Sequence, residues 1–410
     1  MDIKHFAFCQ VNFILSFCYQ CKAIKEMKRG IALIISELIV INIFSQTFIT
    51  REFLPDTCNH DIFLRLEGSM FFKNNEYFTP YTASYTWPGF YLKPQLQYYL
   101  TPSTRISLGY FFEKFFGWDN FWRTIPVFTV QQRLTPGLDL VFGNIYGTLN
   151  HGMEEALLRF DRYMTKPMEY GIQLIYKRPK FSGDTWLNWE RFIYFNSTVQ
   201  EEIQFGHNSL LQVMNYKDVK LSLPLQILVY HHGGHLLTPI RILTVADMMY
   251  GFEIDKPLPD GSVFTIEPLM FLYQGLNVPD TGRNTLPYKH GSAFYFKFKY
   301  TKRNLNAMIG LWMPTQFIAP EGEYLISDIS ETYTTYYEFS RFLFIGKIAF
   351  HRQTKKYLNW ELNAGFYYDP WLNNFAYYYG LYFTINQPFY LGKIHPEKVR
   401  LSDLKFPKKL

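Results

Sequence analysis

Hydrophobic and polar residues alternate over the stretch from 357 to 389. Between 358 and 368 one face carries large apolar side chains such as Trp360 and Phe366, and the positions between them are mostly polar or small. The alternation resumes after a break at 369–374. A side-chain period of two indicates β-strands, and runs of roughly ten residues suit strands that cross a bilayer at a tilt. An apolar face opposite a polar face is typical of a transmembrane barrel, with lipid outside and water inside.

The same alternation predicts about sixteen strands within residues 60–389, an even number, as bacterial single-chain barrels have. On the first of them Leu64 and Leu66 face one side, and Arg65 and Glu67 face the other. The predicted strands lie near 62–72, 89–100, 104–115, 122–134, 138–146, 168–178, 184–195, 203–215, 218–231, 243–254, 262–273, 292–302, 304–313, 340–352, 357–368 and 375–389.

The connections between these strands alternate between short and long. Turn-like segments are predicted on one side at 101–103, 135–137, 216–218, 301–303 and 353–356, and long connections on the other at about 147–167, 274–291 and 314–339. Outer-membrane barrels have short periplasmic turns and longer extracellular loops. Pro94, Pro224 and Pro268 fall inside predicted strands, where each removes a ladder donor and indicates a bulge or a misplaced boundary.

The chain resembles Gram-negative outer-membrane β-barrels of the general-porin size class, in its pattern over 60–389 rather than in a sharp motif. Its last strand is similar to the carboxy-terminal assembly signal of such barrels at Gly380, Phe383, Ile385 and Phe389. Those barrels usually end at that aromatic residue, whereas here a basic tail continues from 390 to 410. The resemblance implies an all-β transmembrane antiparallel barrel in the outer membrane. It also implies a porin-like channel for passive or weakly selective passage of small solutes.

The amino terminus carries a displaced secretory signal. Met27, Lys28 and Arg29 precede an apolar run from 31 to 44 that ends in Ser45 and Gln46. This pattern predicts a signal peptide at 27–45, translation starting at Met27 and a mature chain beginning near Gln46. Residues 1–26 are then a mis-called upstream extension, with a genuine cytosolic extension or a cysteine metal site as the rival. Residues 46–59 are expected to form a short periplasmic segment.

Charge argues against a nucleic-acid partner. The formal net charge of +6 is confined to residues 1–45 and to the tail at 390–410, which leaves the body neutral. A basic patch at one end of the chain does not form the extended basic surface that binds nucleic acid. The expected partners are outer-membrane lipid, small solutes, and a second copy or a periplasmic protein that binds the basic tail. If the basic tail binds a periplasmic protein, the alternative function is that of a non-conducting barrel that acts as a scaffold or partner in a transport or secretion assembly.

The third outer connection is the most informative segment between strands. Met153, Ala156, Leu157, Phe160 and Met164 fall at helical spacing on one stripe. In the porins that the chain resembles, the corresponding loop folds into the lumen and narrows it; the alternative is a surface helix packed on the rim. The resemblance places four charged side chains at a constriction: Glu154, Glu155, Arg159 and Arg162.

Further charged residues are expected to face the lumen from the strands. As a pore lining they would set ion or solute preference; the alternative is a filled, salt-bridged interior. The candidates are Arg65, Glu67, Lys297, Lys299, Arg341, Lys347 and Glu361.

Neither a metal site nor an active site is predicted. His231, His232 and His235 form a weak metal candidate near the end of a strand, with a glycine-rich outer turn as the simpler interpretation. No serine has a recognisable nucleophile context, so enzymatic activity would require a histidine–serine contact that folding creates. The chain is therefore expected to be a barrel without a cofactor and without enzymatic activity.

Overall fold

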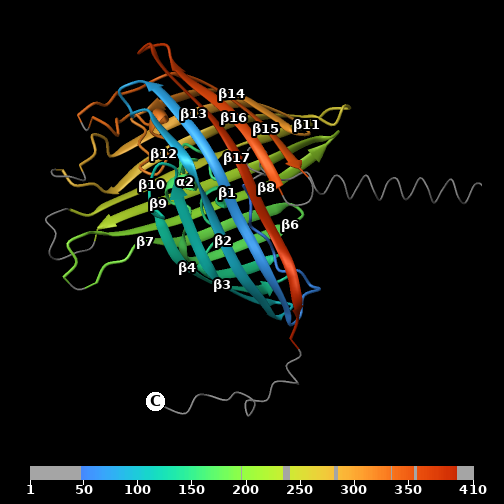
Figure 1. The fold of residues 1–410 in the computed structure, drawn as a ribbon. Helices are drawn as coiled ribbons and strands as arrows, with labels where there is room; N and C mark the ends of the chain where they lie inside the picture. The colour runs from blue at the N-terminus through green and yellow to red at the C-terminus, as the bar shows by residue number, and fades with distance from the viewer. Residues whose placement is uncertain are drawn as a thin grey trace, which may run out of the picture. The chain divides into compact units, whose positions relative to one another are not determined.

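A computed structural model describes residues 48–394, except 195, 234–240, 281–284, 334 and 355–357. Seventeen strands form one antiparallel sheet that closes by pairing β1 with β17, so that the first and last strands lie side by side (Figure 1). The strands are β1 (Asp61–Phe78), β2 (Tyr85–Thr101), β3 (Thr104–Phe115), β4 (Arg123–Thr135), β5 (Leu138–Asn144), β6 (Tyr170–Arg178), β7 (Phe181–Arg191), β8 (Glu201–Tyr216), β9 (Val219–Gly233), β10 (Leu243–Gly251), β11 (Glu253–Pro257), β12 (Val263–Asn277), β13 (His290–Lys302), β14 (Leu305–Thr315), β15 (Leu343–Thr354), β16 (Leu358–Asp369) and β17 (Asn374–Lys393).

The seventeen strands form a sixteen-stranded barrel, because β10 and β11 are two parts of one strand. Both parts pair with β9 and β12, and their register against β12 is the same on either side of the interruption at Phe252. Pro268 lies opposite this interruption and has no N–H to donate. Pro268 was predicted to mark a bulge or a misplaced boundary. It interrupts the hydrogen-bond ladder between these strands without changing their register.

The predicted strands, their faces and the closed all-β barrel are confirmed. On β13, Lys297 and Lys299 are buried in the lumen, whereas Phe294 on the opposite face is exposed. The connections at one end of the barrel are all short, and the long ones, such as 145–169 and 316–342, lie at the other end together with the short connection 370–373. The outward side chains are mostly apolar because they face lipid hydrocarbon, and the inward ones are polar.

Three segments occupy the lumen. The first is 48–60, which covers most of the segment 46–59 that was expected in the periplasm: the backbone N–H groups of Thr50 and Arg51 donate to Asn150 Oδ1 at 2.7 and 2.9 Å. The second is the loop 145–169, with a 3₁₀ turn η1 (Thr148–His151) and a short helix α2 (Arg162–Thr165). The third is the loop 316–342, with a 3₁₀ turn η2 (Tyr324–Ile326). No helix among the described residues is long and apolar enough to span a membrane.

The loop 145–169 enters the barrel without forming the helix that its apolar stripe suggested. Only its last turn is α-helical, and residues 152–161 form turns and bends. Leu157 and Met164 are nevertheless fully buried, and Phe48 packs with both Tyr163 and Tyr382. The stripe therefore marks an apolar surface that packs inside the barrel, and burial rather than helical periodicity explains its composition.

Candidate active site on the outer face of the barrel

The charged residues predicted at a constriction all lie in the lumen, where each has a partner. Glu154 pairs with Lys297 at 2.8 Å and Glu155 pairs with Lys347. Arg159 lies over the ring of Tyr324. The fourth residue, Arg162, is fully buried between the carboxylates of Glu190 and Glu321.

The strand residues predicted to line a pore also have polar partners inside the lumen. Arg65 contacts Glu52 from the segment 48–60, which also contacts Arg105. The remaining pairs are Glu67 with Lys93, Lys297 and Lys299 with Glu267, Arg341 with Asp369, and Glu361 with Asn363. The described lumen thus corresponds to the filled, salt-bridged alternative, while the effect of these residues on solute passage stays a prediction.

The histidines considered for metal binding do not converge. His231 and His232 are neighbours on β9 and therefore point to opposite faces of the sheet. His231 bonds to Thr244 Oγ1 at 2.9 Å, and His232 lies 3.6 Å from Glu202. His235 lies outside the described residues. Across the part of the chain that the structure describes, no group of three or more His, Cys, Asp or Glu residues could hold a metal ion.

A chain of three hydrogen-bonding side chains lies on the outer face of β7 and β8. Ser209 Oγ is 3.0 Å from Nε2 of His207, and Nδ1 of the same ring is 2.8 Å from Thr185 Oγ1. His207 and Ser209 share a face because they are two residues apart on one strand. Thr185 joins them because it is the direct cross-strand partner of His207.

The outer position of this site follows from the alternation along β8. Phe205 and Leu211, on the same face as His207 and Ser209, are exposed. Asn208, on the opposite face, donates from Nδ2 to the lumen carbonyl oxygen of His151 at 2.7 Å. Polar side chains in the hydrocarbon region are costly and usually functional. Here the three groups satisfy one another, which reduces that cost.

His151, which is fully buried, differs from the partly exposed His207 in what it contacts. Its two ring nitrogens lie 2.9 Å from Asp184 and 3.0 Å from Glu169, and the ring stacks on Trp186 at 3.5 Å. Burial alone would lower the pKa of His151, but the two carboxylates outweigh it and raise that pKa. Both nitrogens are occupied and the side chain is inaccessible, so His151 cannot serve as a base for a bound substrate.

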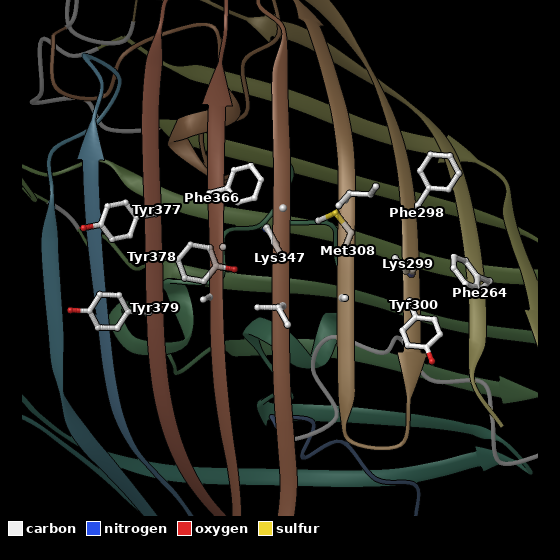
Figure 2. Close-up of a pocket in the computed structure, with 16 residues that line it drawn as sticks. Phe264, Phe298, Lys299, Tyr300, Met308, Lys347, Phe366, Tyr377, Tyr378 and Tyr379 are labelled. Carbon is white, nitrogen blue, oxygen red and sulfur yellow. The ribbon is translucent and has the colours of Figure 1, made fainter. Parts of the chain in front are cut away.

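A concave surface lies on a different part of the outer wall. Its volume is about 620 Å³, and Figure 2 shows Phe298 and Tyr300 on one side of it with Tyr377 and Tyr379 on the other. Small residues such as Ala307, Gly346 and Ala364 form the floor. No serine, histidine, aspartate or glutamate lines this groove, and the ammonium groups of Lys299 and Lys347 pair with lumen carboxylates. The groove therefore offers apolar contact rather than reactive chemistry.

The arrangement at β7 and β8 has the parts of a serine hydrolase site. A serine hydroxyl becomes a nucleophile when an adjacent histidine accepts its proton, and a third group fixes the histidine tautomer. With Nδ1 protonated and donating to Thr185, Nε2 is free to accept the Ser209 proton. Thr185 orients the ring but carries no negative charge, and the carboxylate of Asp184 points into the lumen instead. The site therefore has a neutral third member.

The sequence carried a signal for this site that the search for nucleophile motifs missed. A histidine and a serine at i and i+2 on a predicted lipid-facing strand, here 203–215, are two polar side chains on a face that should be apolar. Motifs of soluble hydrolases place the serine on a strand-to-helix turn, a geometry that a barrel strand does not have. Thr185 could not be assigned, because its partnership depends on strand register.

Solved outer-membrane barrels resemble the structure at low sequence identity. A loop L8 deletion mutant of OmpT from Vibrio cholerae is 10% identical, with a TM-score of 0.47, over 79% of this chain and 99% of that one. OprD from Pseudomonas aeruginosa is 9% identical, with a TM-score of 0.46, over 84% and 97% of the two chains. At these values the likeness says nothing about activity. No curated protein matches the sequence.

A family described as lipid A 3'-O-deacylase-type matches residues 54–394, which include Thr185, His207 and Ser209. A deacylase is an enzyme, so the expectation of a barrel without enzymatic activity is wrong. That expectation rested on the lack of a soluble-hydrolase nucleophile motif in the sequence. The expected location, the outer membrane of a Gram-negative bacterium, is confirmed. The chain belongs to the lipid A 3'-O-deacylase-type family, and it is a sixteen-stranded outer-membrane barrel.

Proposed function

We propose that this barrel hydrolyses an acyl ester of lipid A, with Ser209 as the nucleophile and His207 as the general base. The observation that carries the proposal is the continuous contact from Ser209 through His207 to Thr185 on the wall that faces lipid. The family description supplies the substrate class. A site on the outer wall suits a substrate whose acyl chains already lie in the membrane, because these chains need not leave the hydrocarbon to reach it.

The reaction follows from the hydrogen bonds of the site. The Ser209 hydroxyl gives its proton to His207 Nε2 as Oγ attacks the ester carbonyl carbon. The tetrahedral intermediate collapses, the bond to the alcohol oxygen breaks, and that oxygen takes the proton from His207. Water then attacks the acyl-serine with His207 again accepting a proton, which releases the fatty acid and restores Ser209. Thr185 holds the imidazole in the required tautomer throughout.

Fatty-acid release from lipid A tests this assignment. The purified protein in mixed micelles is expected to release fatty acid, measured by mass spectrometry. Ser209→Ala should lower the rate by on the order of 10³-fold or more. Ser292→Ala is the matched control, because Ser292 lies on the outer face of β13, away from the site. Equal rates for the wild-type protein and Ser209→Ala would contradict the assignment.

Passage of small solutes through the lumen remains a separate prediction. The ion pairs across the lumen and the three segments inside it favour a closed barrel over a channel. Planar-bilayer recordings of the purified protein test the channel directly. Steady single-channel conductance would support it, and a folded protein that does not conduct would leave the hydrolase as the function of the barrel.

A further inference from the structure

The segments inside the lumen differ in how deeply they are buried. In the loop 316–342, the run 325–328 is buried throughout. In the segment 48–60, which we call the strap, only Phe48 and Leu54 are buried, and the other residues are partly or fully exposed. The strap therefore borders solvent along most of its length, whereas the loop is part of a packed core.

Polar contacts with the barrel wall hold the strap in place. Glu52 contacts Arg65 and Arg105, and 35% of the Glu52 side chain stays exposed. An ion pair with one partner in contact with water is less costly to break than a fully buried pair. The remaining polar contacts are Arg51 with Asp184 at 3.1 Å, the Leu54 N–H with Asp139 Oδ2 at 3.0 Å, Gln131 Nε2 with the Glu52 carbonyl oxygen at 3.0 Å, and Asp56 with Arg133.

The wall behind the strap can face water once the strap has left it. Every wall side chain in the polar contacts above is charged or an amide. The loop 316–342 instead covers an apolar wall, where Phe317 packs on the fully buried rings of Phe271 and Trp312. Withdrawing that loop would expose large apolar surfaces to water, whereas withdrawing the strap exposes mainly groups that water hydrates. The strap is therefore the removable segment of the two.

One end of the strap is fixed next to β1. The His60 N–H donates to the Tyr99 carbonyl oxygen at 2.7 Å, and the His60 carbonyl oxygen accepts from the Ile394 N–H at 2.9 Å. The φ angle of His60 is +60°, a left-handed conformation at the point where the strap turns into β1. This point lies at the short-turn end, which is periplasmic in barrels of this kind. The rest of the strap can move without disturbing the first strand.

A small cavity lies beyond the inner end of the strap. Its volume is about 20 Å³, which is room for about one water molecule. Phe48 and Thr50 of the strap line it together with Glu67 and Lys93 of the wall. It also borders Met168, which leads into β6 at the long-connection end of the barrel. Removal of the strap would join this cavity to the periplasmic half of the lumen.

We infer that the strap is a gate, and that its withdrawal from the wall of β1 to β7 opens a water-filled path for small hydrophilic solutes, with anions preferred. The barrel is closed while the strap is bound. This function is independent of hydrolysis at Ser209, because it uses the lumen and not the outer wall.

The preference for anions follows from the charges that the strap leaves behind. Arg65 contacts Glu52 and donates to the Thr50 carbonyl oxygen at 3.1 Å, so both of these partners leave with the strap. Arg105 keeps only neutral partners on the wall: Tyr99, Gln131 and Tyr146. The carboxylates of Asp139 and Asp184 keep hydrogen bonds to Gln131 and His151. The open path therefore carries uncompensated positive charge, which attracts anions.

Planar-bilayer recordings of a strap deletion test the path. The protein lacking residues 48–56 should show steady single-channel conductance and a reversal potential that indicates anion preference. Arg65→Glu/Arg105→Glu in the same deletion protein should reverse that preference. Heat-modifiable migration in SDS gels shows whether each barrel is folded. A folded deletion protein that does not conduct, or one whose ion preference ignores the two arginines, would overturn the inference.

A full-length variant separates a gate from a fixed plug. Arg51→Gln/Glu52→Gln keeps the strap but removes its ion pairs with Asp184, Arg65 and Arg105, and it should raise the open probability about tenfold or more. Asp260→Asn/Lys302→Gln is the matched control, because it removes an exposed ion pair outside the strap. It should stay as closed as the wild-type protein. Equal open probabilities for the two double variants would show that the strap is a fixed plug and would overturn the gate.

A reversible cross-link provides the converse test. Thr50→Cys/Asn150→Cys is added to the Arg51→Gln/Glu52→Gln protein in a Cys58→Ser background, at the position where the Thr50 N–H donates to Asn150 Oδ1 at 2.7 Å. Oxidation should abolish the openings, and dithiothreitol should restore them. Openings that persist when mass spectrometry shows complete cross-linking would overturn the gate. Ser209→Ala should leave all these recordings unchanged, so the outcome is separate from that of the proposed hydrolase.

Discussion

His151 and His207 are both histidines with two engaged ring nitrogens, yet the structure gives them different chemical capacities. His151 lies in the lumen between the carboxylates of Glu169 and Asp184. His207 lies on the lipid-facing wall between the hydroxyls of Thr185 and Ser209. Carboxylates stabilise a positively charged imidazolium, so His151 acts as a structural cation. Hydroxyl partners carry no charge and leave His207 able to accept and return a proton, as the proposed reaction requires.

The comparison extends to the two faces of the barrel. In the lumen, charged side chains from distant segments are buried in pairs, and removing one partner leaves an uncompensated charge. On the outer wall, a few neutral polar groups lie among apolar side chains, and changing them alters chemistry more than stability. Lumen substitutions should therefore affect unfolding, and substitutions at the β7–β8 site should affect turnover.

The largest effect is expected at His207. His207→Asn removes the general base, and the rate of fatty-acid release should fall by on the order of 10³-fold. The free energy of unfolding should change by less than about 1 kcal/mol, the range of ordinary surface substitutions. Urea unfolding in lipid vesicles measures the stability of the same sample. A variant that loses activity only in proportion to its unfolded fraction would place His207 with the structural residues.

The opposite pattern is expected at His151. His151→Phe retains an aromatic ring against Trp186 but removes the cation that Glu169 and Asp184 share, which leaves Glu169 only Arg162 at 3.8 Å and Asp184 only Arg51 at 3.1 Å as cationic partners among the described residues. The free energy of unfolding should decrease by about 3–5 kcal/mol, while the rate per folded molecule stays near that of the wild-type protein. An unchanged unfolding midpoint would show that the carboxylates find other partners, and the contrast with His207 would weaken.

A smaller effect on turnover is expected at Thr185. Thr185→Val keeps the shape of the side chain but removes the acceptor for His207 Nδ1, so kcat should fall by roughly tenfold while KM is maintained. Thr185→Ser restores the hydroxyl and should recover most of the rate. If the valine and serine variants are equally slow, packing at this position matters more than the hydrogen bond.

The smallest effect is expected in the pH dependence of the free energy of unfolding. The folded-state pKa of His151 is raised by Glu169 and Asp184 despite the opposing effect of burial. A raised pKa means that its contribution to stability is complete below the pKa of the unfolded chain and is lost as pH rises through the folded value. The free energy of unfolding of the wild-type protein should therefore decline as pH rises above the ordinary histidine range. His151→Phe should lack this component of the decline; identical slopes would show that other groups cause it.

The local periodicity of the sequence was sufficient to predict the strands and their faces. Lys297 was expected to point inward and does so, because lipid on one side forces apolar residues to that side. Its partner Glu154 lies 143 residues away in the chain, and no local pattern could identify that pair. The amino-terminal segment 46–59 was expected in the periplasm for the same reason: its contacts with Asn150 and Asp139 depend on a loop and a strand much further along the chain.

The proposed active site falls between these two cases. His207 and Ser209 were visible as two polar residues on one lipid-facing stretch, but a search for soluble hydrolase motifs passed over them. Thr185 became their neighbour only through the register between β7 and β8. The signal peptide predicted at 27–45 and most of the basic tail at 390–410 lie outside the described residues and remain predictions.

The sequence by itself determined that this chain crosses the outer membrane as a barrel of about sixteen strands, and which side chains face lipid. It could do so because a period of two is a local property that each strand expresses alone. Only the tertiary structure decided that the lumen is filled, which charges pair across it, and which serine contacts a histidine that is held by a threonine. These outcomes depend on strand register and on loops folding inward, and both join residues that are distant in the chain.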